Sequence, residues 1–129
     1  MKFNIFLIAF GCLLGSAGIS AAQDAAAGEK VFAKCRACHQ VGETAKQGVG
    51  PILNGLVGRK AGTIEGYNYT EANKNSGLTW DEATLADYLK NPKAKIPGTK
   101  MIFPGLPKDD EITNIIAFLK QYGPDGKKS

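Results

Sequence analysis

The segment from residue 40 to residue 77 is the part of this 129-residue chain that most constrains its fold. It is rich in Gly, Asn, Thr and Lys, it contains the turn-forming stretches GVGP, LVGRKAG and GYNY, and it has no convincing strand pattern. A loop region this long inside a compact domain normally counts against a self-sufficient core. A large apolar ligand at the centre removes the difficulty, because the loops can pack on it and bind their backbone groups to it.

Three amphipathic stretches predict helices on either side of this segment. Residues 24–39 form the first, capped by the aspartate that begins it. The second opens with the capping box TWDE, whose cap is Thr79, and it ends at Asn91, before a proline. The third, residues 107–123, begins with a proline and three acids and carries Ile and Leu on one stripe. With no repeat and no internal linker, the chain is predicted to be one all-α domain whose tail, residues 125–129, frays.

The first 22 residues are typical of an export signal. A lysine near the start is followed by an apolar middle and by small residues ending at Ala22, in the spacing that export peptidases accept. We therefore predict a signal peptide, residues 1–22, cleaved after Ala22, and a mature domain of residues 23–129. An uncleaved membrane anchor is the alternative, because the apolar run approaches the ~20 residues that span a bilayer. A lipoprotein anchor at Cys12 is disfavoured by the bulky phenylalanine two residues before it.

Cys35, Cys38 and His39 form the motif Cys-X-X-Cys-His, and His39 is the only histidine of the chain. A structural zinc site needs four ligands, and the mature chain offers no second Cys or His pair. A thiol redox switch usually lies between a strand and a helix, and no strand precedes this motif. A plain disulfide would leave His39 unexplained. The interpretation that uses all three residues is a covalently attached haem, whose vinyl groups take the two thiols and whose iron takes the imidazole.

A haem iron held by His39 has a sixth position, for which Met101 is the candidate ligand. Apart from the initiator, it is the only methionine, and it lies in the Pro/Gly-rich turn segment IPGTKMIFPG, where there is no helical stripe to fill. The alternative role for a single methionine is to fill the core. Lys100 and its neighbours would have to lose a proton before they bound iron. A His39–Met101 pair raises the potential of a haem, because the thioether favours ferrous iron.

These motifs resemble those of class I cytochromes c, and in particular mitochondrial cytochrome c and the bacterial cytochrome c-two group. The segments CRACH, GP, GRKAG, GYNYTEANKNSGLTW, NPKAKIPGTKMIF and IIAFLK occur in the family's order and near its spacing, over nearly the whole mature chain. The resemblance implies the all-α cytochrome c fold, in which three main helices and several short ones wrap one haem c bound covalently through Cys35 and Cys38. It also implies that Gly28 and Phe32 on the first helix cross Phe118 on the last.

The resemblance assigns roles to residues that the haem motif alone does not reach. Pro51 would offer its carbonyl to His39, which fixes the ring and strengthens its donation to iron. Three residues match positions that hydrogen-bond a buried haem propionate: Arg59, Tyr69 and Trp80. Three others match the polar network beside the methionine ligand: Asn73, Tyr88 and Thr99. Without the resemblance, a surface cation and a core aromatic are the simpler interpretations of Arg59 and Trp80.

The expected function follows from the filled axial positions of the iron. With His39 and Met101 both bound, no open position remains for a substrate. We therefore expect a soluble periplasmic one-electron carrier of respiration or photosynthesis, cycling between ferric and ferrous iron, and not an enzyme. The alternative is a haem peroxidase or gas-binding sensor, in which Met101 detaches. No second His, Arg or carboxylate is obviously poised as an acid–base group, which disfavours this alternative.

The expected partners are membrane redox complexes, such as a cytochrome bc complex, an oxidase or a reaction centre. The resemblance places six lysines around the haem edge that would meet them: Lys34, Lys46, Lys93, Lys95, Lys100 and Lys108. The formal net charge is +4, and it becomes +3 when removal of the signal peptide takes away one lysine and no acid. Scattered solvating lysines are the alternative, because so small a charge proves nothing by itself. We expect a monomer, no stable membrane insertion after processing, and no nucleic-acid partner, because no recognition motif accompanies the lysines.

Overall fold

The computed structural model describes Gly11 and residues 23–129, so the predicted signal peptide and its cleavage after Ala22 lie outside the described residues. Five helices follow one another in the described chain: α1 (Ala25–Phe32), α2 (Glu71–Lys74), α3 (Glu82–Lys90), α4 (Pro92–Lys95) and α5 (Asp109–Lys120). Two isolated antiparallel bridges, Lys60 with Thr79 and Tyr122 with Lys128, are the β-type pairing found between residues 23 and 129. The prediction of an all-α fold with three main helices and short ones is confirmed.

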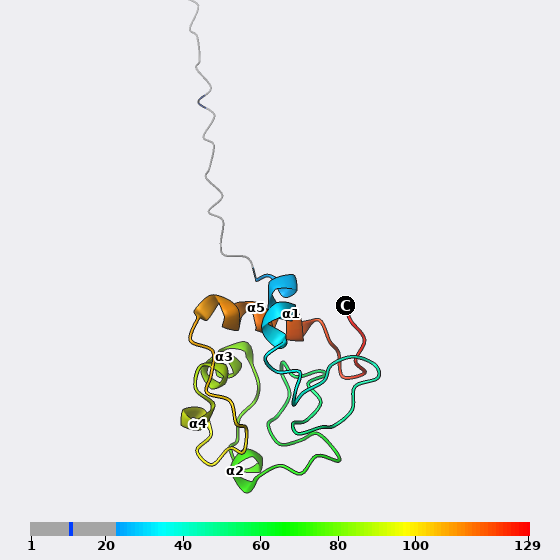
Figure 1. Ribbon diagram of the computed structural model, residues 1–129, viewed down its shortest axis with the longest axis vertical. Coiled ribbons are helices and arrows are strands. Elements are labelled where there is room, and N and C mark those ends of the chain that lie inside the picture. The colour runs from blue at the N-terminus through cyan, green and yellow to red at the C-terminus, as the bar shows by residue number, and fades with distance from the viewer. Residues whose placement is uncertain (1–10, 12–22) are drawn as a thin grey trace, which may run out of the picture.

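Helices α1 and α5 cross, at the top of the molecule in the view of Figure 1. The crossing is close because Gly28 has no side chain: a Cβ atom there would lie 1.9 Å from the carbonyl oxygen of Asn114 in α5. One turn further on, the rings of Phe32 and Phe118 pack with their centroids 5.1 Å apart. The structure therefore has the crossing that the resemblance implied.

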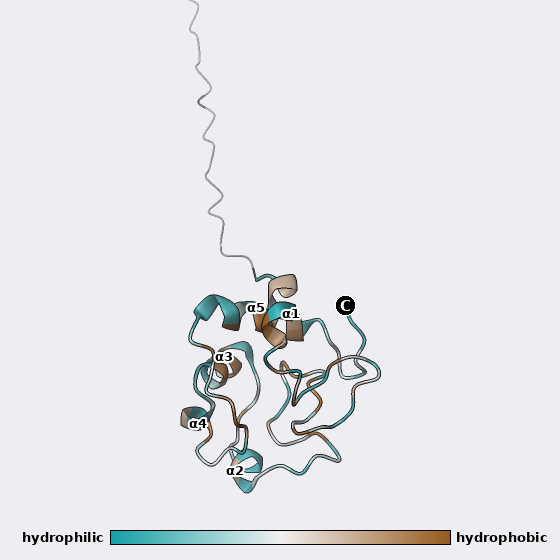
Figure 2. Cartoon of the chain, viewed as in Figure 1, coloured by the Kyte–Doolittle hydropathy of each residue, from teal (hydrophilic) through white to brown (hydrophobic). Residues whose placement is uncertain are grey.

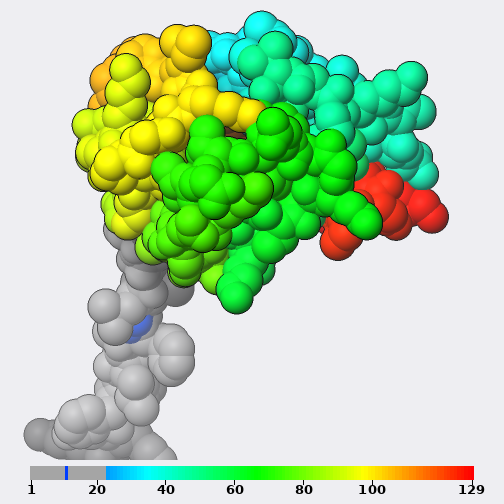
Figure 3. Space-filling model, turned by 90° about the horizontal axis from the view of Figure 1, so that it is seen from below, coloured from blue at the N-terminus to red at the C-terminus, as the bar shows by residue number. Residues whose placement is uncertain are grey.

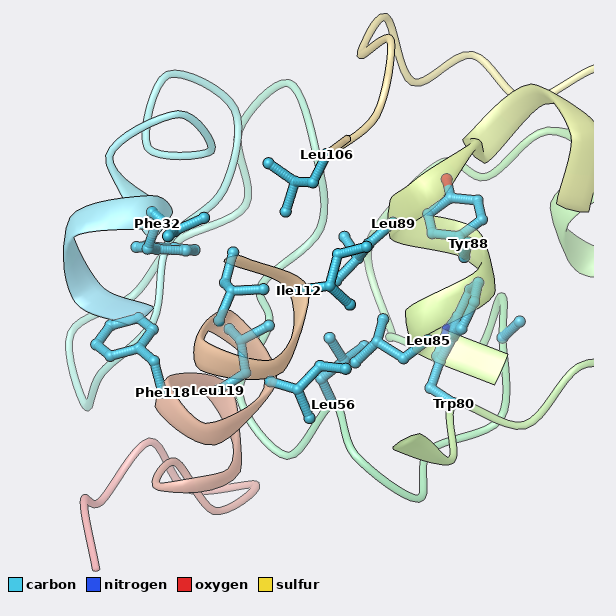
Figure 4. Close-up of a cluster of buried hydrophobic side chains, with 14 of the residues drawn as sticks. Phe32, Leu56, Trp80, Leu85, Tyr88, Leu89, Leu106, Ile112, Phe118 and Leu119 are labelled. Atoms are coloured by element: carbon cyan, nitrogen blue, oxygen red, sulfur yellow. The ribbon is translucent and has the colours of Figure 1, made fainter. Parts of the chain in front are cut away.

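The hydrophobic core lies beneath this crossing and extends to α3. Figure 2 shows the brown, apolar sides of α1, α3 and α5 directed toward one another. Figure 4 shows the contributing side chains, with Leu85 and Leu89 reaching from α3 toward Ile112 and Leu119 on α5. Tyr88 packs instead against Trp80, with ring centroids 4.8 Å apart. None of the helices in the described part of the chain is long and apolar enough to cross a membrane.

The start of α3 differs from the prediction. The cap is Asp81, whose carboxylate accepts a hydrogen bond from the amide of Thr84 at 2.8 Å, and it is not Thr79. The reason is that Thr79 pairs with Lys60 in an antiparallel bridge, which keeps its backbone extended three residues before the helix begins. The hydrogen bonds from Thr84 lower the pKa of the Asp81 carboxyl. The cap is therefore present at neutral pH and is lost as the pH falls through the lowered pKa.

The end of α3 agrees with the prediction, and Asn91 and Pro92 have a further role there. The helix stops at Lys90, and Pro92 then occupies the first turn of α4, where its missing amide hydrogen costs nothing. The side chain of Asn91 caps this new helix by accepting from the amide of Ala94 at 3.3 Å. The short helix α4 leads into the segment that carries Met101.

The C-terminal tail is ordered against the body, so the prediction that it frays is wrong. Tyr122 and Lys128 form a bridge, and the amide of Ser129 donates to the carbonyl of Gln121 at 2.8 Å. Gly126 is buried, and a Cβ atom there would lie 2.2 Å from the carbonyl oxygen of Gly42. The tail thus covers the loop that follows the Cys-X-X-Cys-His motif, a contact between distant segments that local composition does not predict.

Candidate functional site

One cavity of about 280 Å³ lies among the loops and below α5. Its walls are largely apolar, with side chains such as Leu56, Leu85, Leu89 and Leu119. All eleven predicted site residues line it: Cys35, Cys38, His39, Pro51, Arg59, Tyr69, Asn73, Trp80, Tyr88, Thr99 and Met101. The structure therefore brings together residues from five different segments of the sequence around a single space.

The first helix ends at Phe32, so the prediction that it extends to residue 39 is wrong. The two thiols and the imidazole are instead presented by tight turns that continue from α1. The amides of Cys38 and His39 both donate to the carbonyl of Cys35, at 3.1 and 2.9 Å. Cys35 and Cys38 are free thiols, and burial, reinforced by the neighbouring thiol, raises the pKa of Cys35. Both sulfur atoms are therefore available for covalent attachment on the cavity side of this turn.

His39 is oriented by the loop that passes beneath its ring. Its Nδ1 atom lies 2.8 Å from the carbonyl oxygen of Pro51, and because an oxygen of this kind only accepts, Nδ1 carries the proton and Nε2 keeps its lone pair. Burial lowers the pKa of His39, against the effect of the Pro51 hydrogen bond. The ring is thus held as a neutral imidazole, the form that binds metals.

Gly50 makes this passage possible. A Cβ atom at Gly50 would lie 2.3 Å from Cε1 of His39, closer than two such atoms approach. The residue before the orienting carbonyl must therefore be glycine if the ring is to keep this position.

Met101 lies on a segment without helical structure and is held by side chains. The hydroxyl of Tyr88 is 3.6 Å from the Met101 sulfur and 3.4 Å from Oγ1 of Thr99. Oγ1 of Thr99 also accepts from the amide of Met101 at 3.3 Å. Burial raises the pKa of Tyr88, so its hydroxyl stays protonated and can donate to the sulfur.

Arg59 points its guanidinium into the cavity wall. Its NH1 group donates to the carbonyls of Ile52 and Asn54, at 3.2 and 2.9 Å, which uses both NH1 hydrogens. Its Nε atom is buried without a partner among the described residues, as is Oδ1 of Asn73. Trp80 is fixed beside Arg59 because its amide donates to the Arg59 carbonyl at 2.8 Å.

Comparison with known proteins identifies this arrangement. The family model for cytochrome c matches residues 25–123. The chain belongs to the cytochrome c family. It is 60% identical to cytochrome c-554 of Methylosinus trichosporium over 121 residues, which cover 94% of this chain and 90% of the relative. It is 59% identical to cytochrome c2 of Rhodoblastus acidophilus over 107 residues, which cover 83% of this chain and all of the relative.

A solved structure agrees with the fold of this cytochrome. Cytochrome cH from Methylobacterium extorquens superposes with a TM-score of 0.71 at 55% sequence identity, over 75% of this chain and 97% of that one. The predicted membership of the class I, cytochrome c-two type is confirmed.

The cofactor of this cytochrome is one haem c, bound covalently through Cys35 and Cys38, and the cavity fits it. A haem needs apolar walls around its ring and polar partners for its charged propionates. The described cavity has such walls, and the buried Nε of Arg59 is a donor that still lacks an acceptor. A carboxylate is the acceptor that a buried guanidinium binds best.

Two of the six predicted rim lysines line the cavity, and four do not. Lys34 and Lys100 are among the lining residues, whereas Lys46, Lys93, Lys95 and Lys108 are not. Lys34 forms an ion pair with Glu111 at 3.1 Å, which offsets part of its charge. A lysine rim around the whole haem edge stays a prediction.

Two residues of the site were not predicted from the sequence. Gly50 belongs to the turn stretch GVGP, whose composition gives no sign of the ring beside it. Tyr67 lies in GYNY, and its hydroxyl donates to the carbonyl of Val49 at 2.7 Å. The sequence signal for Tyr67 was its place two residues before Tyr69, a predicted site residue. In the structure the two rings pack edge to face with centroids 4.8 Å apart.

Proposed function

We propose that this cytochrome c is a soluble, periplasmic, monomeric one-electron carrier, and not an enzyme, whose haem iron is held by His39 and Met101. The observation that carries the proposal is that one cavity is lined by both thiols, by an oriented neutral imidazole and by a thioether sulfur. When bound, the haem supplies a one-electron couple between ferric and ferrous iron.

The residues of the chain would keep that couple protected and its ligands in place. Pro51 holds the His39 ring, and Tyr88 holds the Met101 sulfur. Apolar walls keep water from the centre of the cavity, and Arg59 is available to neutralise a buried carboxylate. Ligands held in this way change position little between the two oxidation states, which suits electron transfer.

The peroxidase or gas-sensor alternative lacks the groups it would need. No carboxylate lines the described cavity, and the chain has a single histidine, which is the proposed proximal ligand. Proton transfer to a bound oxygen species requires such an acid–base group within reach.

Carbon monoxide binding to the ferrous protein tests the ligand set. If Met101 binds the iron, the wild-type protein at neutral pH should bind carbon monoxide very slowly, and a Met101→Ala variant should bind it at least about 100-fold faster, because the competing ligand is gone. Stopped-flow absorbance measures both rates. Fast binding by the wild-type protein would refute the proposal.

Export is supported by the length of a relative. The match to cytochrome c2 of Rhodoblastus acidophilus spans 107 residues and the whole of that protein. This is the number that remains when 22 residues are removed from 129. We therefore propose cleavage after Ala22 to leave the domain of residues 23–129, and N-terminal sequencing of the purified protein tests it.

We also propose that the partner is a membrane redox complex with an acidic surface, met through Lys34, Lys100 and the neighbouring lysines. Transfer to such a complex should slow about tenfold between 10 mM and 1 M salt, because steering of this kind is screened. Lys100→Gln should flatten this dependence, whereas Lys127→Gln, in the C-terminal tail, should leave it unchanged. A salt-independent rate for the wild-type protein would contradict the rim.

A further inference from the structure

We propose that Tyr67 and Lys100 form a latch that holds the Met101 segment closed over the cavity and so limits the entry of small molecules to the iron. The inference rests on the proposed ligation by Met101. It adds two positioning residues that neither the haem attachment nor the axial ligands require.

The segment that carries Met101 needs such a restraint. Residues 100–105 make no backbone–backbone hydrogen bond within the described chain. The nearest ones are the amide of Thr99 to Ile96 at 3.0 Å, and the amide of Leu106 to Leu89 at 2.8 Å. Ile102 is 98% exposed. The segment is therefore held by its side chains.

Lys100, directly before Met101, reaches across to the GYNY loop. Its ammonium group lies 4.6 Å from the centre of the Tyr67 ring and donates to the carbonyl of Asn68. An ammonium over an aromatic face is attracted by the negative charge of the ring face. Figure 3 shows the yellow segment near residue 100 lying against the green part of the chain on this side of the molecule.

Tyr67 continues the connection to the other side of the cavity. Its hydroxyl donates to the carbonyl of Val49 at 2.7 Å, and Val49 precedes the two residues that contact the His39 ring. Val49, Tyr67 and Lys100 all line the cavity. The latch therefore joins the segment of one proposed ligand to the loop that positions the other.

The latch contacts are partly exposed, so each contributes modestly. A hydrogen bond of ordinary net strength shifts an equilibrium about fivefold, and an exposed cation–ring contact shifts it about threefold. The closed form is favoured, but opening stays accessible. Removing one contact should therefore change how often the segment opens without unfolding the protein.

Imidazole binding to the ferric holoprotein measures this opening. Imidazole must displace the methionine sulfur, so at high imidazole the rate levels off at the rate of opening. Tyr67→Phe keeps the ring and loses the bond to Val49, and it should raise the limiting rate about three- to tenfold. Lys100→Met should raise it about as much, and Lys100→Arg, which keeps a cation over the ring, should restore the wild-type rate.

Matched controls separate the latch from a general loosening of the fold. Tyr122→Phe removes a hydroxyl that makes no side-chain hydrogen bond among the described residues, and Lys127→Met removes an ammonium of the C-terminal tail that does not line the cavity. Both should bind imidazole at the wild-type rate. Tyr67→Phe should keep a urea midpoint close to that of the wild type. If the hydroxyl only stabilised the fold, the urea midpoint would fall as the imidazole rate rises.

A double-mutant cycle tests whether the two residues act together. If they form one latch, Tyr67→Leu and Lys100→Met combined should open the cavity little more than either alone. Multiplying effects would overturn the latch, and so would single variants that match the wild type.

The failure of the latch and the failure of the proposed ligand set look different. A wild-type ferric protein that lacks the sulfur-to-iron charge-transfer absorption and takes up imidazole at once would refute Met101 ligation, and the latch with it. A wild-type protein that shows the absorption and slow entry, with variants that behave identically, would refute the latch alone.

Discussion

The Gly28→Ala variant is expected to lose about 3 kcal/mol or more of unfolding free energy, at or above the upper end of what overpacking usually costs. The added methyl carbon would lie 1.9 Å from the carbonyl oxygen and 2.6 Å from the carbonyl carbon of Asn114, and 2.8 Å from Cβ of Phe118. Because the first two are backbone atoms of α5, no side chain can rotate away. The helices must separate instead, which also loosens the contact between Phe32 and Phe118. Urea unfolding of the holoprotein measures the loss.

Gly123→Ala is the matched control for this substitution. The nearest atom to a Cβ at Gly123 is a carboxylate oxygen of Asp125 at 3.2 Å, at the end of a side chain that can move. This variant should stay within about 0.5 kcal/mol of the wild type, as surface substitutions usually do. Equal stability of the Gly28 and Gly123 variants would show that the helix crossing does not depend on the missing side chain.

The Gly50→Ala variant should lose most of the His39 ligation of its covalently bound haem, with the affinity of the imidazole for iron lowered about 10- to 100-fold, as is typical when a group that orients a metal ligand is disturbed. A Cβ at Gly50 would lie 2.3 Å from Cε1 and 2.7 Å from both nitrogens of the His39 ring. The ring must turn away from Pro51, and the lone pair of Nε2 then no longer points along its original direction. The yield of holoprotein and the spectrum of its axial ligands measure the effect.

Gly48→Ala tests the same loop without touching the ring. Its Cβ would meet only the carbonyl oxygen of Cys38, at 3.3 Å, which a shift of a few tenths of an ångström relieves. The Gly48 variant should keep the axial-ligand spectrum of the wild type. A Gly50 variant with an unchanged ligand spectrum would mean that the ring position does not depend on this close approach.

Helix positions were predictable where the signal was local. The apolar stripe of α5 and the proline after Asn91 located helix boundaries to within a few residues. The cap of α3 was misplaced because the capping-box pattern does not reveal that Thr79 pairs with Lys60 across the fold. The tail was wrongly predicted for the same reason. Its polar composition suggests mobility, and only the structure shows that Gly126 packs against Gly42.

The residues of the site likewise fall into those that the sequence predicts and those that only the structure reveals. Spacing alone was enough to bring Cys35, Cys38 and His39 together as a haem attachment motif. The orienting partner of His39 came from resemblance to a family. The close approach of Gly50 and the connection from Lys100 through Tyr67 needed coordinates, because the contacting residues are far apart in the chain and their types are common in any loop.

The chemistry of this protein is thus determined by its sequence, because attachment of a haem requires two thiols and an imidazole at fixed short spacing, and such spacing can be read from the chain. The tertiary structure alone decides where glycine is obligatory beside the imidazole and which segments the Met101 segment contacts. These features depend on distances between segments that meet only after folding, and no local pattern of residue types records those distances.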